Sequence, residues 1–157
     1  MDITTLAAWG EFLGGIAVVV SLIYLASQIR QNSKLLRAST TAMICDHSNA
    51  VAYTISEDAD LNRIYWNGLL DRESLSEEDR RRFDPVIGAL ITSLNAEYHL
   101  WREGAISPPV WQSRCHALQF AMASAGVRQW WRDWKQLYDD EFDEFVDGLI
   151  REGEAAG

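Results

Sequence analysis

The stretch "WGEFLGGIAVVVSLIYLAS", residues 9–27, decides the fold, because its length and composition are those of a membrane span. It lies within 21 residues, Leu6 to Ala26, that carry a single charged side chain, Glu11. At 1.5 Å per residue, a helix of this length measures roughly 31 Å, which is close to the thickness of a bilayer's hydrocarbon core. The run therefore predicts a helix that crosses a membrane.

Two other kinds of segment can share this composition. A secretory signal peptide has a positively charged start, a shorter apolar core and a small-residue cleavage site. The only charge before the run is the acid Asp2, so a cleaved signal ending near "LAS" is disfavoured. A buried first helix of a soluble protein, which could then be an enzyme, stays open as the alternative.

The residues that flank the run predict its orientation. Trp9 and Tyr24 lie near its two ends, where amphipathic rings favour the headgroup region. Three bases follow it, Arg30, Lys34 and Arg37, whereas the short N-terminal side has none. The positive-inside rule then places the N-terminus outside and the remainder of the chain in the cytoplasm. We expect residues 1–28 to form the transmembrane segment and residues 29–157 a cytoplasmic α-helical domain.

Small residues form a stripe along one face of the expected span. They recur in steps of three and four, at Ala7, Gly10, Gly14, Ala17 and Ser21. Helices in lipid associate by close backbone approach over small residues, and Gly10 with Gly14 also forms a G-x-x-x-G pair. The stripe predicts a homo-oligomer that brings copies of the flanking Glu11 together. Small residues are also common in membrane helices that do not associate, so ordinary membrane-helix composition is the alternative explanation of the stripe.

The rest of the chain predicts an all-α fold. Residues 28–56 contain no Pro or Gly, so the first helix is expected to run on into the cytoplasm as far as a break near "SEDAD". A short helix around residues 61–69 follows, and Gly68 with "LLDRES" suggests a turn. No window alternates with period two. The expected fold is a long helix that begins in the membrane, followed by a bundle of four to five shorter helices.

Cap and proline signals predict where the later helices begin. Ser76 with Asp79 forms a capping box that opens the next helix. Pro85 either kinks that helix or starts a separate one. Ser107 before Pro108 marks another start. The acidic segment from Asp139 onward carries a regular apolar stripe and predicts a last amphipathic helix.

The candidate metal and nucleophile residues have unfavourable spacing. Residues one or two positions apart point to different sides of a helix, so they do not converge on one metal ion. This spacing applies to three pairs: Cys45 with His47, Cys115 with His116, and Glu97 with His99. No third group is evident that would orient His116 as a base for a Cys115 nucleophile. Nucleotide-binding and hydrolase motifs are absent from the sequence. We expect no cofactor, no metal site and no enzymatic activity.

Charge placement bears on partners. The net charge of −9 argues against nucleic acid, and eight of the acids fall between Asp139 and Glu154 against one base there. This segment is expected to be a solvated helix, with docking to a basic partner as the alternative. In "RQWWRDWK", three tryptophans predict a core face; a membrane-surface patch formed with the neighbouring bases is the other interpretation.

Four stretches together resemble a group of small bacterial single-pass inner-membrane proteins with a helical cytoplasmic domain. They are "GGIAVVVSLIYLASQIRQNSKLLRA", "LNRIYWNGLLDRESLSEEDRRRF", "YHLWREGAISPPVW" and "VRQWWRD". The resemblance implies a place in the bacterial inner membrane and supplies no catalytic residue.

Taken together, the sequence predicts a non-enzymatic membrane protein that associates with itself in the lipid bilayer and acts as a scaffold or sensor through its cytoplasmic domain. The alternative function is an oligomeric pore or cation channel with Glu11 near its outer mouth.

Overall fold

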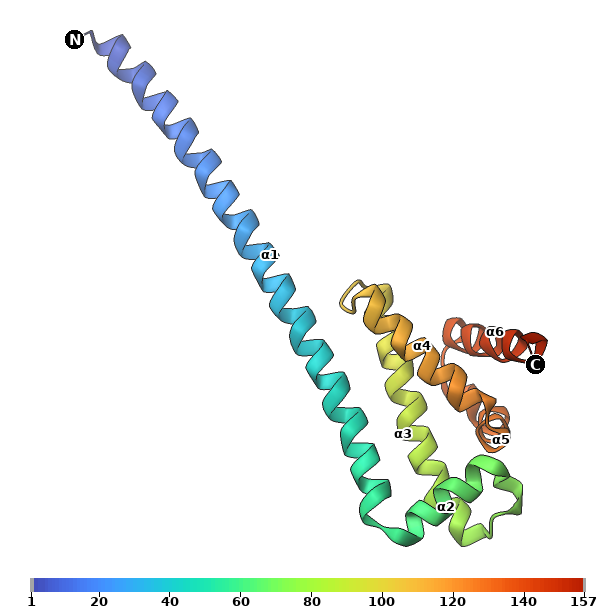
Figure 1. The fold of residues 1–157 in the computed structure, drawn as a ribbon. Coiled ribbons are helices and arrows are strands. Elements are labelled where there is room, and N and C mark those ends of the chain that lie inside the picture. The colour runs from blue at the N-terminus through green and yellow to red at the C-terminus, as the bar shows by residue number, and fades with distance from the viewer. Residues whose placement is uncertain (1, 157) are drawn as a thin grey trace. The chain divides into compact units, whose positions relative to one another are not determined.

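The computed structural model describes residues 2–156, with the backbone alone for residues 5–8 and 154–156. Within that range the chain is all-α, with six α-helices, two short 3₁₀ turns and no strand (Figure 1). In chain order the elements are α1 (Ile3–Glu57), α2 (Ala59–Leu70), η1 (Arg72–Ser74), α3 (Glu77–Arg102), α4 (Pro108–Ala123), α5 (Ala125–Trp134), η2 (Lys135–Leu137) and α6 (Asp140–Ala156). The expected all-α fold, one long helix followed by four to five shorter ones, is confirmed, and the structure has five of them.

Two compact units divide the chain within α1, Met1–Ser39 and Thr40–Gly157. The first unit holds the apolar part of α1, and the second unit holds the end of α1 together with α2–α6. This division reflects packing within the protein. The expected membrane boundary at residue 28 concerns lipid and stays a prediction.

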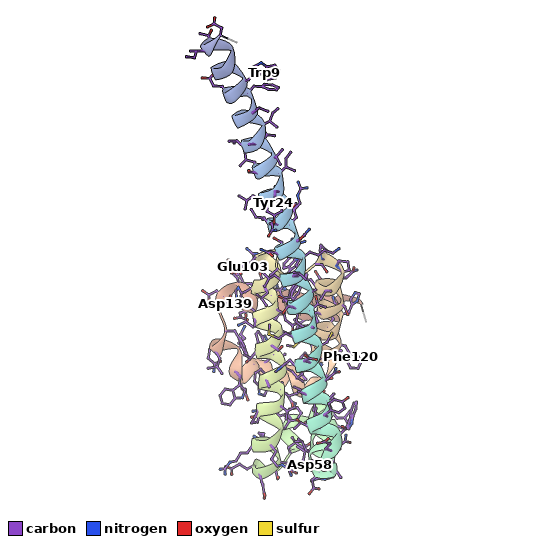
Figure 2. All side chains as sticks on the ribbon, turned by 90° about the vertical axis from the view of Figure 1, so that its left-hand side faces the viewer. Trp9, Tyr24, Asp58, Glu103, Phe120 and Asp139 are labelled. Atoms are coloured by element: carbon purple, nitrogen blue, oxygen red, sulfur yellow. The ribbon has the colours of Figure 1, made fainter. Side chains whose placement is uncertain are left out.

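Helix α1 is unbroken from Ile3 to Glu57, as the absence of Pro and of later Gly predicts. Its large apolar side chains from Trp9 to Ile29 are 46–65% exposed. Over this stretch α1 is long and apolar enough to cross a membrane. Trp9 and Tyr24 are labelled on it in Figure 2.

The core of the second unit forms around one face of α3. Phe83, Ile87 and Ile91 on that face are almost fully buried, and α2, α4 and α5 all contact this helix. Helix α6 packs against α4 and buries Phe142 and Val146 completely. The apolar residues recur every three or four positions, so each helix turns one face inward.

Side-chain caps fix the helix starts. The Asp58 carboxylate accepts a hydrogen bond from the Leu61 amide at 2.9 Å and opens α2 at the expected break. Ser76 accepts one from the Asp79 amide at 3.1 Å and opens α3, as its capping pattern predicts. Ser107 precedes α4 as expected, but its side chain makes no capping hydrogen bond.

The expected turn follows α2 within "LLDRES", but Gly68 is not part of it. It lies inside α2, which ends at Leu70, and the turn begins at Asp71. A Cβ on Gly68 would lie 2.4 Å from the Phe83 ring, and one on Gly126 would lie 1.6 Å from the Gly68 carbonyl oxygen. Glycine is therefore required by close helix packing.

The fold bears on two questions that the sequence left open, the role of Pro85 and the location of the tryptophan-rich segment. Pro85 lies inside α3, which continues through it, so no separate helix starts there. In the tryptophan-rich segment, Trp130 and Trp131 are buried in the core, whereas Trp134 is 39% exposed. The core interpretation holds for two of these three rings.

Candidate functional site

The predicted stripe lies on an open face of α1 in the first unit. Gly10 and Gly14 have nothing within 4 Å of the position a Cβ would occupy. Ala17 and Ser21 are exposed, and the Ser21 hydroxyl donates to the Ala17 carbonyl oxygen at 2.8 Å, so it needs no partner outside the helix. The fifth member, Ala7, has a side chain outside the described set. The four described positions present backbone and small side chains to whatever covers them.

The other residues predicted for this unit are exposed too. Glu11 lines a shallow apolar groove on α1 in which Gly15 leaves room between larger side chains. The Tyr24 hydroxyl accepts a hydrogen bond from Gln28 at 2.7 Å. The three bases that follow the span are exposed: Arg30, Lys34 and Arg37.

A buried ion pair joins two helices of the second unit. The Glu97 carboxylate on α3, 3% exposed, accepts hydrogen bonds from Arg114 on α4, with 2.5 Å to Nε and 3.2 Å to Nη2. Ser93 donates a third hydrogen bond to Glu97 at 3.0 Å. A carboxylate this deep is tolerated because the guanidinium and the hydroxyl satisfy it.

The same arginine reaches the end of α1. Arg114 Nη1 donates to the Ser48 hydroxyl at 3.4 Å, which is a long hydrogen bond. Ser48 lies on the less exposed side of the part of α1 that belongs to the second unit, together with Thr40, Ile44, Val51 and Ile55. Arg114 thus connects α1, α3 and α4 at one point.

An apolar cavity of about 200 Å³ adjoins this cluster. It lies among α2, α3, α4 and α5, and Ser48 of α1 and Arg114 line part of it. Phe120, also part of the wall, is 76% exposed. Figure 2 marks Phe120 on α4. Ion pair and cavity together form the most distinctive site of the second unit.

The pairing of these residues was missed by sequence reasoning, which considered Glu97 only as a partner of His99. The two side chains diverge in the structure, since His99 bonds Asp139 at 2.8 Å. Glu97 and Arg114 are 17 residues apart and on different helices, so no local pattern relates them. An acid among the apolar positions of α3 was the one available signal.

The two cysteines, Cys45 and Cys115, were considered as a nucleophile or as metal ligands. Cys45 is exposed, and Cys115 is partly buried. Burial raises the pKa of the Cys115 thiol, which disfavours the nucleophilic thiolate at neutral pH. Among the described residues, no group of three or more His, Cys, Asp or Glu side chains could hold a metal ion.

The acids of the C-terminal segment contact bases of their own domain. Asp143 and Asp147 both bind Lys135, at 3.0 and 2.8 Å, and Asp139 binds His99. The hydrogen bond from His99 and the bond from the Phe142 amide hold the pKa of Asp139 below its usual value. These carboxylates help to fix α6 on the domain, in line with the solvated-helix interpretation.

A second buried charge, Arg72, was also absent from the sequence expectations. It binds Asp84 through two hydrogen bonds of 2.7 and 2.8 Å and Asp133 through one of 2.7 Å. Hydrogen bonding to Asp84, more than to Asp133, raises the pKa of the guanidinium further above its already high value. Because the buried guanidinium binds both carboxylates, this cluster fixes the η1 turn against α3 and α5.

No protein-family profile, no curated protein and no solved structure matches this chain. The resemblance to small bacterial inner-membrane proteins therefore stays a prediction.

Proposed function

We propose that this protein is a non-enzymatic, single-pass protein of the bacterial inner membrane that associates with itself through α1 and presents α2–α6 in the cytoplasm as a scaffold or sensor. The observation that carries the proposal is the exposed apolar surface of α1 between Trp9 and Ile29. Soluble proteins rarely leave so large a continuous apolar surface in water.

The free energy at stake supports membrane insertion. Ten large aliphatic or aromatic side chains from Phe12 to Leu25 are 46–65% exposed. Covering the exposed part of each contributes on the order of 1 kcal/mol, or about 10 kcal/mol in all. A bilayer covers such a helix on every side, and the bases that follow the span favour a cytoplasmic location for the second unit.

Self-association is supported by the continuation of the stripe. Counting on in threes and fours from Ser21, every position is exposed and none is charged: Tyr24, Gln28, Gln31, Leu35, Ala38, Ala42, Cys45, Asn49, Ala52 and Ser56. A period of 3.5 residues is the pattern of helices that wind around each other. Copies inserted in one orientation are parallel, so each stripe residue would meet its own counterpart.

Cys45 makes this register testable, because it lies on the stripe and its side chain is exposed. In membranes that contain the Cys115→Ser protein, a short bismaleimide is expected to join two chains through Cys45. Replacing Gly10 and Gly14 together by Leu is expected to abolish the cross-link. Gly15→Leu is the matched control, since Gly15 has the same open surroundings but lies off the stripe.

Two results would count against the proposal. A protein recovered in the soluble fraction without detergent would return α1 to the role of a soluble helix. A cross-link that survives Gly10→Leu with Gly14→Leu, or is lost equally in Gly15→Leu, would remove the stripe as the contact surface.

A sensor role is supported by the continuity of α1. The helix has no break between the apolar stretch and Ser48, whose hydroxyl accepts a hydrogen bond from the partly buried Arg114. A change in how α1 packs in the membrane can therefore reach the Arg114–Glu97 pair without crossing a flexible linker.

A pore is the second candidate, motivated by Glu11 next to Gly10 on an exposed helix face. Copies that associate through the stripe would bring these carboxylates near one another. Bilayer recordings of the purified protein test it: cation conductance that falls in Glu11→Gln supports a pore, and silent bilayers or indifference to the substitution oppose it.

A further inference from the structure

We propose that the cavity of the second unit binds a single uncharged alkyl chain. This proposal goes beyond the function above and does not depend on self-association, because every residue that lines the cavity belongs to the second unit.

The first argument is volume. Well-packed protein cores contain few voids larger than one water molecule. The cavity measures about 200 Å³, which exceeds the roughly 150 Å³ of an engineered apolar cavity that stays dry and takes up benzene. In an apolar space of this size the wall side chains lack packing partners on one side, and an apolar ligand would supply those contacts.

The second argument is shape. Along α4 and its C-cap the lining residues extend from Arg114 to Ser124, and along α3 from Ile87 to Leu94. At 1.5 Å per residue these stretches are roughly 15 and 10 Å long. The wall of the cavity therefore extends along both helices. A flexible methylene chain can follow such a wall more readily than a rigid fused ring system.

The third argument is the chemistry of the wall. Six branched aliphatic side chains line it: Leu69, Ile87, Leu90, Ile91, Leu94 and Val127. The one charged lining residue, Arg114, already binds Glu97 through two nitrogens. Because that positive charge is matched, an ionised ligand gains no counter-charge there. The hydroxyls of Ser48 and Ser124, which also line the cavity, suit an uncharged polar end of the chain.

The mouth of the cavity is marked by Phe120. This ring is 76% exposed although it belongs to the wall, and an entering chain would cover it. Ser48 brings α1 to the same cavity, so an occupied cavity would bear on the contact between α1 and Arg114.

The test is binding of 1-octanol to the full-length protein, held in a steroid-based detergent whose rigid rings do not imitate an alkyl chain. Saturable one-to-one binding by calorimetry, with a thermal upshift of several degrees, is expected. Ala121→Leu places a larger side chain in the cavity and is expected to abolish binding. Ala123→Leu is the matched control, because Ala123 is exposed on the same helix and does not line this cavity.

Ala117→Ile fills the cavity from another position and serves if Ala121→Leu does not fold. Mass spectrometry of the protein purified without added alcohol distinguishes the natural source: a phospholipid retained by the wild type but not by the filled variant indicates a bilayer acyl chain, and a fatty alcohol indicates a free ligand. A retained fatty acid, which is ionised at neutral pH, would contradict the uncharged ligand. Absence of octanol binding by the wild type, or equal affinity in the filled variant, overturns the proposal.

Discussion

Removing the Arg114 guanidinium tests the energetic importance of the buried ion pair. In Arg114→Met the aliphatic part of the side chain is kept, but among the described residues the Glu97 carboxylate, 3% exposed, then keeps a hydrogen bond from the Ser93 hydroxyl alone, at 3.0 Å. Breaking a buried pair by removing one partner typically costs about 3–5 kcal/mol, because the remaining charge is uncompensated. We expect a loss near 3 kcal/mol in the free energy of unfolding, or roughly 10 °C in Tm.

The reverse substitution is expected to cost less. In Glu97→Leu the unmatched group is Arg114, which is 19% exposed and can turn its guanidinium toward water. Replacing both residues, Glu97→Leu with Arg114→Met, leaves no buried charge and is expected to recover most of the stability lost in Arg114→Met. The double-mutant cycle should then give a coupling energy of about 2 kcal/mol or more.

The assay is urea unfolding of the full-length protein in mild detergent, followed by tryptophan fluorescence. Trp9 is replaced by Phe in every variant so that the signal reports on the second unit. The control cycle uses Glu77 and Arg81, whose side chains are 82% and 77% exposed and four residues apart on α3, with an expected coupling below about 0.5 kcal/mol. Equal coupling energies in the two cycles would refute the reasoning.

Two further predictions concern close packing and acid stability. Gly126→Ala places a Cβ 1.6 Å from the Gly68 carbonyl oxygen and is expected to destabilise the domain by about 3 kcal/mol in urea unfolding. The control Gly88→Ala, whose Cβ would lie 3.4 Å from its nearest neighbour, is expected to leave the stability nearly unchanged. A Gly126→Ala protein as stable as the wild type would contradict the close contact. The His99 hydrogen bond is the main cause that lowers the pKa of the Asp139 carboxyl in the folded protein. The carboxylate therefore stabilises the fold at pH values above its usual pKa of 3.8, and this contribution is lost as the pH falls through the lower pKa of the folded state. Asp139→Asn should therefore lower Tm at pH 6 and show a shallower loss between pH 5 and pH 3, and parallel curves would argue against the pair.

Much of the helical architecture is readable from local sequence. The apolar run, the absence of Pro and Gly after it, and the caps at Asp58 and Ser76 each act within one helix or one turn. Local patterns of this kind depend on neighbours three or four residues away, so a sequence displays them directly.

The features that single out the candidate site have a different origin. Glu97 meets Arg114 across 17 residues, and Arg72 meets Asp133 across 61. Such pairs form only when helices pack, and the volume of a cavity depends on how several helices meet. Gly68 shows the same limit, because a glycine demanded by a neighbouring ring and a glycine that ends a helix look alike in sequence.

The contact between Gly126 and Gly68 also bears on the motions of the domain. Two backbones meet there with no side chain between them, so α2 and α5 cannot slide past each other by changing rotamers. Any alternative conformation of the domain has to keep this crossing and differ elsewhere. Amide hydrogens around the crossing are then expected to be among the slowest to exchange with solvent in the second unit. Glycine, the residue with the most backbone freedom in an unfolded chain, would here occupy one of the most rigid places in the fold.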